Sequence, residues 1–234
     1  MTYTEEDLNR DMTVITELGA DKEPEDIYMK IQWEMARVHK LIVRHWIQIH
    51  KQFNTSAPID DAENYFGYAG HWVHHHHSFE EEISFPRWAP NLSTTTEQSQ
   101  HKELMTELYR FQEYIAAVTA KSEPWSATKA EAHAQALLPP LMSHLVGELH
   151  TLDPDALRRS GLTAEALTDI SDAVIKATQT SLDMHKDIPA LLLHNDGDLD
   201  WPTTTWQRTA EFTMPPELYK PYAECVFLRY ICYW

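Results

Sequence analysis

Apolar residues recur at every third or fourth position along most of the chain, which is the spacing of one buried face of an α-helix. Stretches with this spacing cover about residues 24–53, 60–85, 97–121 and 127–152, and a fifth covers about residues 163–186. Segments with proline, asparagine and serine separate them, and the chain holds only six glycines. The pattern predicts an all-α fold.

The periodicity fades from Pro189 onward, where the segments HNDGDLDWPTTTWQ and TMPPELYKPY are rich in proline, aspartate and tryptophan. We expect an irregular arm there that packs its aromatic side chains back onto the helices. The chain then divides into residues 1–154, with a lead-in segment and the first four helices, and residues 155–234, with the fifth helix and the arm.

The charge balance narrows the classes of partner. The chain has 19 Lys and Arg against 36 Asp and Glu, a formal net charge of −17, which disfavours nucleic acids and anionic membrane surfaces. It has no apolar run of about eighteen residues, so we expect no membrane span. The acidic segment MTYTEEDLNRD resembles neither a signal nor a transit peptide, and Cys225 and Cys232 make no disulfide framework. We therefore expect a cytoplasmic protein.

Histidines stand inside the apolar stripes of the first four predicted helices, and two of them are followed by a glutamate four residues later. Residues four apart share a helix face, because each residue advances by roughly 100°. Burying a carboxylate beside an imidazole costs free energy unless a proton or a metal ion compensates. The candidate metal ligands are His39, His76, Glu80, His101, His144 and Glu148.

A lone histidine on an apolar face is usually a core residue bonded to a backbone carbonyl. Four such helices, two of them with a carboxylate one turn on, favour a metal site instead, because six ligands from four antiparallel helices can enclose two ions. Imidazole and carboxylate without thiolate suit iron or manganese better than a structural zinc ion. The alternative is a polar core without metal.

The order of these residues resembles the hemerythrin-like family, which has an HHE cation-binding domain. The segments that carry the resemblance are MARVHKLI, HHSFEEEISFP, QSQHKEL and MSHLVGELHTL, over about residues 30–152. The segment IPALLLHNDGDLDW is similar to the C-terminal extension of fungal members. The resemblance implies an up-down-up-down four-helix bundle with a non-haem di-iron centre, and it implies ligand roles for the six candidate residues.

The chain departs from the oxygen-carrying hemerythrins at Met105, where those proteins have a second histidine one turn after the first. One iron would then lack a nitrogen ligand, and the open position would admit water, O2 or substrate. This favours an enzyme that activates O2 to oxidise a small organic molecule. By analogy with fungal members that have such a C-terminal extension, we expect the reaction to belong to secondary metabolism. The alternatives are a module that binds or senses O2, NO or iron without turnover, and a structural bundle with an adventitious metal.

Other polar residues near the motif have less direct interpretations. His74, His75 and His77 are expected on a solvated face or behind the metal ligands, and Glu81 is expected in solvent or bonded to a neighbouring histidine. His45 lies near the first apolar stripe and is a candidate acid/base group or additional ligand.

Overall fold

A computed structural model of the protein describes residues 3–20, 22–54, 67–195 and 197–219. Over these residues the chain forms helices and no strand, so the predicted all-α class is confirmed. Among the helices in these ranges, none has a stretch that is both long and apolar enough to cross a membrane. The start of the second predicted helix, both cysteines and the end of the predicted arm fall outside the described ranges.

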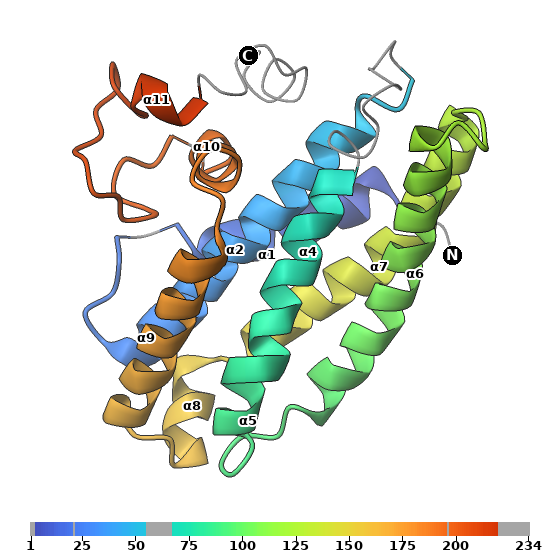
Figure 1. The fold of residues 1–234 in the computed structure, drawn as a ribbon. Coiled ribbons are helices and arrows are strands. Elements are labelled where there is room, and N and C mark those ends of the chain that lie inside the picture. Colours follow the sequence, from blue (N-terminus) through green and yellow to red (C-terminus); the bar gives the residue numbers. More distant parts are fainter. Residues whose placement is uncertain (1–2, 21, 55–66, 196, 220–234) are drawn as a thin grey trace.

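Four long helices lie side by side and surround most of the hydrophobic core (Figure 1). α2 contacts α4 and α7, and α6 contacts the same two helices, so the four enclose a shared interior. These helices are α2 (Ile27–His50), α4 (Gly67–Phe79), α6 (Thr95–Thr119) and α7 (Ala127–Thr151).

The ends of these helices follow from local sequence. The side chains of Asp26 and Ser126 accept backbone N–H groups in the first turns of α2 and α7, which stabilises a helix start by about 1 kcal/mol. α7 contains Pro139 and Pro140 and yet continues to Thr151. The two prolines predict a kink or an interruption of this helix. The helix is not interrupted.

The chain leaves α4 through a π-helix, Glu80–Ser84, and then forms α5 (Phe85–Trp88). A π-helix has wider turns than an α-helix, so side chains after Phe79 point in directions that an uninterrupted α-helix would not give them. Such segments are rare and are found frequently at functional sites. This one begins at a predicted metal ligand.

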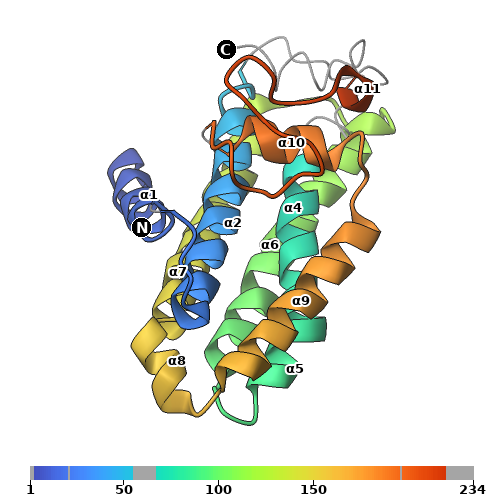
Figure 2. The same cartoon turned by 90° about the vertical axis from the view of Figure 1, so that its left-hand side faces the viewer.

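Further helices cover the outside of these four (Figure 2). α1 packs against α2 and α7, α8 and α9 pack against α2, and α9 also contacts the π-helix. α10 lies across the ends of α2 and α4, where Asp187 lies 3.4 Å from His71. Their bounds, with that of the short α11, are α1 (Glu5–Leu18), α8 (Pro154–Ser160), α9 (Ala164–Ser181), α10 (Asp187–Leu193) and α11 (Pro216–Tyr219).

Two hydrophobic clusters hold these elements together. The main cluster fills the interior of the four long helices and includes Trp46 and Phe111, each of which is at most 1% exposed. Burying a large apolar side chain of this kind contributes about 1.5–3 kcal/mol. The second cluster joins α2, α5, α8 and α9, and it contains both Leu152 and Leu157. Residues on both sides of Pro154 therefore share one cluster.

Candidate metal centre

The six side chains predicted as ligands meet in the interior between α2, α4, α6 and α7, and His77 lies with them. Their candidate ligand atoms form two groups, and within each group these atoms all lie within 4.8 Å of one another. The three-imidazole group consists of His77, Glu80, His101 and His144, and the two-imidazole group consists of His39, His76, Glu80 and Glu148.

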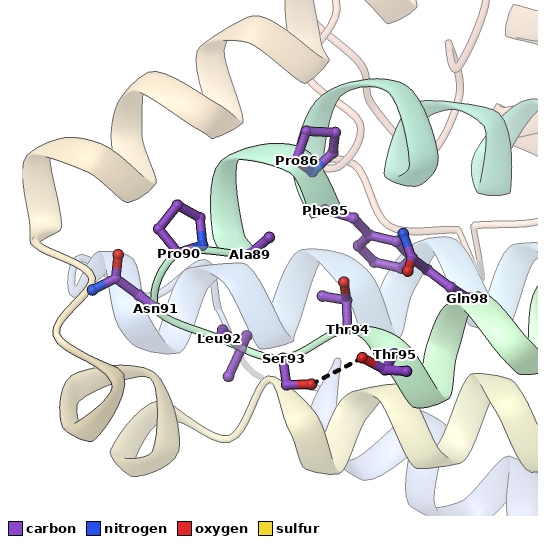
Figure 3. Close-up of a pocket in the computed structure, with 10 residues that line it drawn as sticks. All are labelled: Phe85, Pro86, Ala89, Pro90, Asn91, Leu92, Ser93, Thr94, Thr95 and Gln98. Atoms are coloured by element: carbon purple, nitrogen blue, oxygen red, sulfur yellow. Dashed lines mark hydrogen bonds between the residues drawn. The ribbon is translucent and has the colours of Figure 1, made fainter.

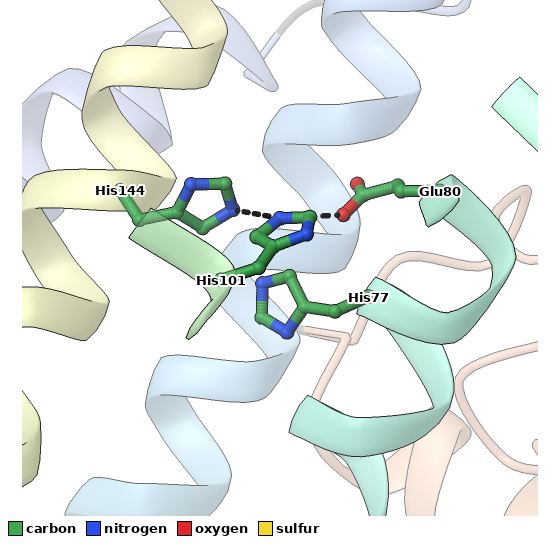
Figure 4. Close-up of side chains that lie close together, drawn as sticks. All are labelled: His77, Glu80, His101 and His144. Carbon is green, nitrogen blue, oxygen red and sulfur yellow. Dashed lines mark hydrogen bonds and ion pairs between the residues drawn. The ribbon is translucent and has the colours of Figure 1, made fainter. Parts of the chain in front are cut away.

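His101, on α6, stands between its partners in the three-imidazole group (Figure 4). Its Nε2 lies 3.0 Å from Nε2 of His144 on α7 and 3.5 Å from Oε2 of Glu80. His77 on α4 faces both rings, with centroid distances of 4.5 Å to His101 and 4.9 Å to His144. Side chains from separate helices therefore converge on a volume that suits a single ion.

The two-imidazole group is built from α2, α4, α7 and the first residue of the π-helix. Nε2 of His39 lies 3.1 Å from Nε2 of His76, which lies 3.0 Å from Oε1 of Glu80. Oε2 of Glu148 lies 3.4 Å from Nε2 of His39 and 3.8 Å from Nε2 of His144. Both carboxylates therefore stand between the two sets of imidazoles.

Hydrogen bonds on the outer nitrogens determine which imidazole atoms face the interior. Nδ1 of His39 and Nδ1 of His77 lie 2.9 Å and 2.7 Å from backbone carbonyl oxygens. Nδ1 of His101 lies 2.8 Å from the carboxylate of Glu81, and Nδ1 of His144 lies 3.3 Å from a glutamine side-chain oxygen. Because these oxygens accept, each Nδ1 carries a proton, and a neutral ring then presents the lone pair of Nε2 to the interior.

The cluster is short of positive charge. Nε2 of His77 and the oxygens of Glu80 and Glu148 make no hydrogen bond of normal geometry within the part of the chain that the structure describes. Burial raises the pKa of Glu80 well above its ordinary value, and the neighbouring Glu148 raises it further. Burial also lowers the pKa values of His77 and His144, and adjacent imidazoles lower them further. A metal cation fits this set, because it binds neutral imidazoles and ionised carboxylates.

The position of His77 corrects the sequence-based prediction, which had placed it on a solvated face or behind the metal ligands. Its side chain is 2% exposed and lies against His101 and His144. Adjacent residues of a helix differ in direction by roughly 100°, so α4 can direct His76 toward α2 and His77 toward α6. No local sequence signal separates these two directions within a run of four histidines.

The expectation of an open metal position beside Met105 stays a prediction. Met105 packs against the main hydrophobic cluster, and His77 brings a third imidazole to His101 and His144. His77, from α4, thus supplies the third imidazole of this group. The two-imidazole group has one nitrogen donor fewer.

The structure does not bring the other candidate, His45, into either group. Its buried ring lies 4.1 Å from the ring of His194 and stacks on Trp72 at 6.2 Å. Of the remaining members of the histidine run, His74 is exposed as expected, and His75 is half-buried with Nε2 2.8 Å from a serine hydroxyl of α9.

The π-helix places two consecutive carboxylates in different layers of the site. Glu80 faces both imidazole groups, whereas Glu81 bonds to the outer nitrogen of His101, one of the two possibilities that the sequence had left open. Directly after the π-helix, Phe85 stacks on the ring of His101 with a centroid distance of 5.2 Å and an interplanar angle of 18°. Phe85 thus covers one face of the His101 ring, and Glu81, four residues earlier, holds its outer nitrogen.

A pocket of about 320 Å³ lies on the outer side of this layer (Figure 3). Phe85, whose ring covers His101, forms part of its wall, and so does Gln98, whose Nε2 donates to Glu81 at 3.3 Å. The rest of the wall mixes apolar residues with hydroxyl and amide groups and contains no charged side chain. A small uncharged molecule in this pocket would touch the residues that orient His101.

The chain was compared with known proteins at three levels. No protein-family model, no curated protein and no solved structure matches it. The resemblance to the hemerythrin-like family therefore stays a prediction from the motifs.

Proposed function

We propose that the four long helices form a hemerythrin-like four-helix bundle, and that the protein uses two bound iron ions to activate O2 and oxidise a small organic substrate. The order of the motifs along α2, α4, α6 and α7 supports the family assignment. The convergence of all six motif residues in one interior supports the metal centre.

One observation carries the proposal, namely the 3.0 Å separation between Nε2 of His101 and Nε2 of His144. Both rings have their outer nitrogen beside an acceptor oxygen, so two lone pairs face each other in the interior. Protonation of one ring would join them, but burial lowers the pKa of His144 well below its ordinary value. A cation that binds both nitrogens resolves the contact without a proton.

The carboxylates support two ions over one. Oε1 of Glu80 faces His76 in one group, and its Oε2 faces His101 in the other. Glu148 lies within 3.8 Å of an imidazole from each group. Carboxylates shared in this way between imidazole sets in a helical interior are the pattern of di-iron and di-manganese proteins.

The donor set favours iron, with manganese as the nearest competitor. It combines imidazoles and carboxylates, and no thiolate belongs to either group among the described residues. When bound, iron supplies the one-electron chemistry with O2 that amino-acid side chains lack. The chain's own residues would hold the ions and exclude bulk water. The hydrogen bonds at the outer nitrogens orient the imidazoles toward the ions.

A second candidate function is reversible binding or sensing of O2, NO or iron without turnover. Its support is the depth of the cluster: Glu80 and Glu148 are at most 3% exposed, and His39 and His144 are completely buried. Such an interior admits a diatomic molecule more readily than an organic substrate. The two candidates share the metal centre and differ in the fate of the bound O2, which is either consumed or released.

The deciding experiment starts from protein loaded with Fe²⁺ under argon and analysed for metal. We expect about two irons per chain, because each group offers four candidate ligand residues. Consumption of more O2 than the bound Fe²⁺ alone can reduce, in the presence of an added reductant, supports the enzyme. An absorption band that persists and reverses under argon supports the binding module. Folded protein with well under one metal per chain contradicts both.

A further inference from the structure

The imidazoles of the cluster differ in what holds their outer nitrogens. His39 and His77 have backbone carbonyls as partners, and His144 has a neutral amide at 3.3 Å. His101 has the carboxylate of Glu81 at 2.8 Å. Of these four rings, His101 is the one whose outer partner carries a full negative charge.

We propose that Glu81 is a positioning residue that makes His101 the strongest donor of the three-imidazole group and so makes the two metal positions electronically unequal. The inference rests on the proposed function. We infer in addition that Glu81 stabilises the more oxidised state of the ion in the three-imidazole group, relative to the ion in the other group. The chemical cause is a shift of N–H bonding electrons toward Nδ1 of His101, which increases the negative charge on Nε2.

The structure fixes Glu81 at both oxygens. Oε1 is bonded to Nδ1 of His101, and Oε2 accepts a hydrogen bond from Nε2 of Gln98, one turn before His101 on α6. Its side chain is 38% exposed, so the carboxylate keeps part of its hydration while His101 is 4% exposed. A charge can be kept at this place far more cheaply than inside the cluster.

The π-helix explains why this contact exists alongside the ligand contacts of Glu80. Glu80 and Glu81 are its first two residues, and the stacking of Phe85 on His101 holds the far end of the same segment against α6. The wide turn lets consecutive glutamates reach opposite edges of one imidazole: Glu80 lies 3.5 Å from Nε2, and Glu81 lies 2.8 Å from Nδ1.

A carboxylate partner is expected to matter in two measurable ways. Loss of an outer hydrogen-bond partner of a metal-bound histidine commonly weakens metal binding by about 10- to 100-fold. A more negative donor also favours a ferric ion over a ferrous ion. A tenfold change in the ratio of these two affinities corresponds to about 59 mV for a one-electron couple.

The test compares Glu81→Gln with Glu82→Gln in the full-length chain. Glu81→Gln keeps an acceptor oxygen for His101 and removes the charge. Glu82 is exposed on the same π-helix, so Glu82→Gln is a control with the same change in net charge. Competition titration with Zn²⁺ measures affinity without redox chemistry, and a potentiometric titration of the iron-loaded protein measures the midpoint potentials.

We expect Glu81→Gln to weaken one of the two Zn²⁺ equivalents by at least about tenfold and to raise one iron potential by tens of millivolts. Glu82→Gln should change neither. Wild-type protein that binds two Zn²⁺ ions, with a Glu81→Gln variant equal to the control, overturns this inference and leaves the proposed function intact. Wild-type protein that binds no Zn²⁺ overturns the proposed function and this inference together.

A second variant covers the case in which Glu81→Gln loses helicity. Gln98→Ala keeps the charge of Glu81 and removes the donor that holds its second oxygen. The same potential should then rise by a smaller amount, because Glu81 is less well oriented toward His101. An unchanged potential in folded Gln98→Ala protein, beside an unfolded Glu81→Gln variant, would count against the positioning role.

Discussion

Nε2 of His39 on α2 lies 3.1 Å from Nε2 of His76 on α4, and the two rings are inclined at 81°. The outer nitrogen of His39 donates to a backbone carbonyl, which leaves its inner nitrogen with a lone pair when the ring is neutral. Glu148 and Glu80 each place an oxygen within 3.4 Å of one of these inner nitrogens. The contact between the two helices is thus built from groups that all attract a cation.

The shared carboxylate of Glu80 gives a prediction whose sign depends on metal. In metal-free protein, Glu80→Gln should raise the free energy of unfolding by on the order of 1 kcal/mol, because a neutral amide replaces a buried acid beside Glu148. In metal-loaded protein the same substitution should lower the free energy of unfolding and remove bound metal. Thermal melts with EDTA and with excess Zn²⁺ test this, and equal shifts of the same sign in both conditions would contradict it.

His77 is predicted to be necessary for one metal equivalent. His77→Ala should reduce bound iron from about two to about one per chain, because the three-imidazole group loses a nitrogen donor. His74→Ala, in the same run but exposed, should leave the metal content unchanged. Metal analysis after gel filtration measures both, and circular dichroism confirms that helicity is kept. Two irons bound to folded His77→Ala protein would remove His77 from the ligand set.

The proposed hemerythrin-like arrangement, with His77 in place of a histidine on α6, predicts a rescue. Met105 lies one turn after His101 on α6, the place where the hemerythrin pattern has a histidine. The double variant His77→Ala/Met105→His should therefore recover the metal equivalent that His77→Ala loses. Met105→His alone should change the metal content little, because His77 is already present. Failure of the double variant, with Met105→His folded, would show that the two positions are not interchangeable.

The burial of His194 predicts a pH dependence away from the candidate metal centre. Burial, and secondly the positive charge of Arg44, lowers the pKa of His194 from 6.5 to about 4. Between these values the unfolded chain binds more protons than the folded one, so the free energy of unfolding falls as the pH falls from about 6.5 to 4. The slope for this one group reaches at most about 1.4 kcal/mol per pH unit.

His194→Gln should flatten that part of the stability curve relative to wild type. His185→Gln, at an exposed histidine of the same region, is the matched control and should leave the slope unchanged. Urea unfolding at pH 7, 6 and 5 gives the slopes, and the difference between the two variants removes the contribution of the metal ligands. Equal slopes in both variants would show that His194 does not carry this dependence.

The sequence determined the features that depend on the chain's own periodicity. The helical class and the inward direction of His39, His101 and His144 follow from apolar residues at helical spacing, because a side chain inside an apolar stripe is buried with that stripe. The pairing of His144 with Glu148 follows from the same spacing, since residues four apart share a face. These features need no knowledge of neighbouring helices.

The tertiary structure decided which of these side chains come together and what supports them. The role of His77 depends on the position of α6 relative to α4, and the contact of Glu81 with His101 depends on the π-helix at Glu80–Ser84. Neither is marked in the sequence, because a histidine run and a glutamate run offer several directions with similar local free energy. Packing between helices selects one direction, and this selection sets the number of imidazoles available to each metal position.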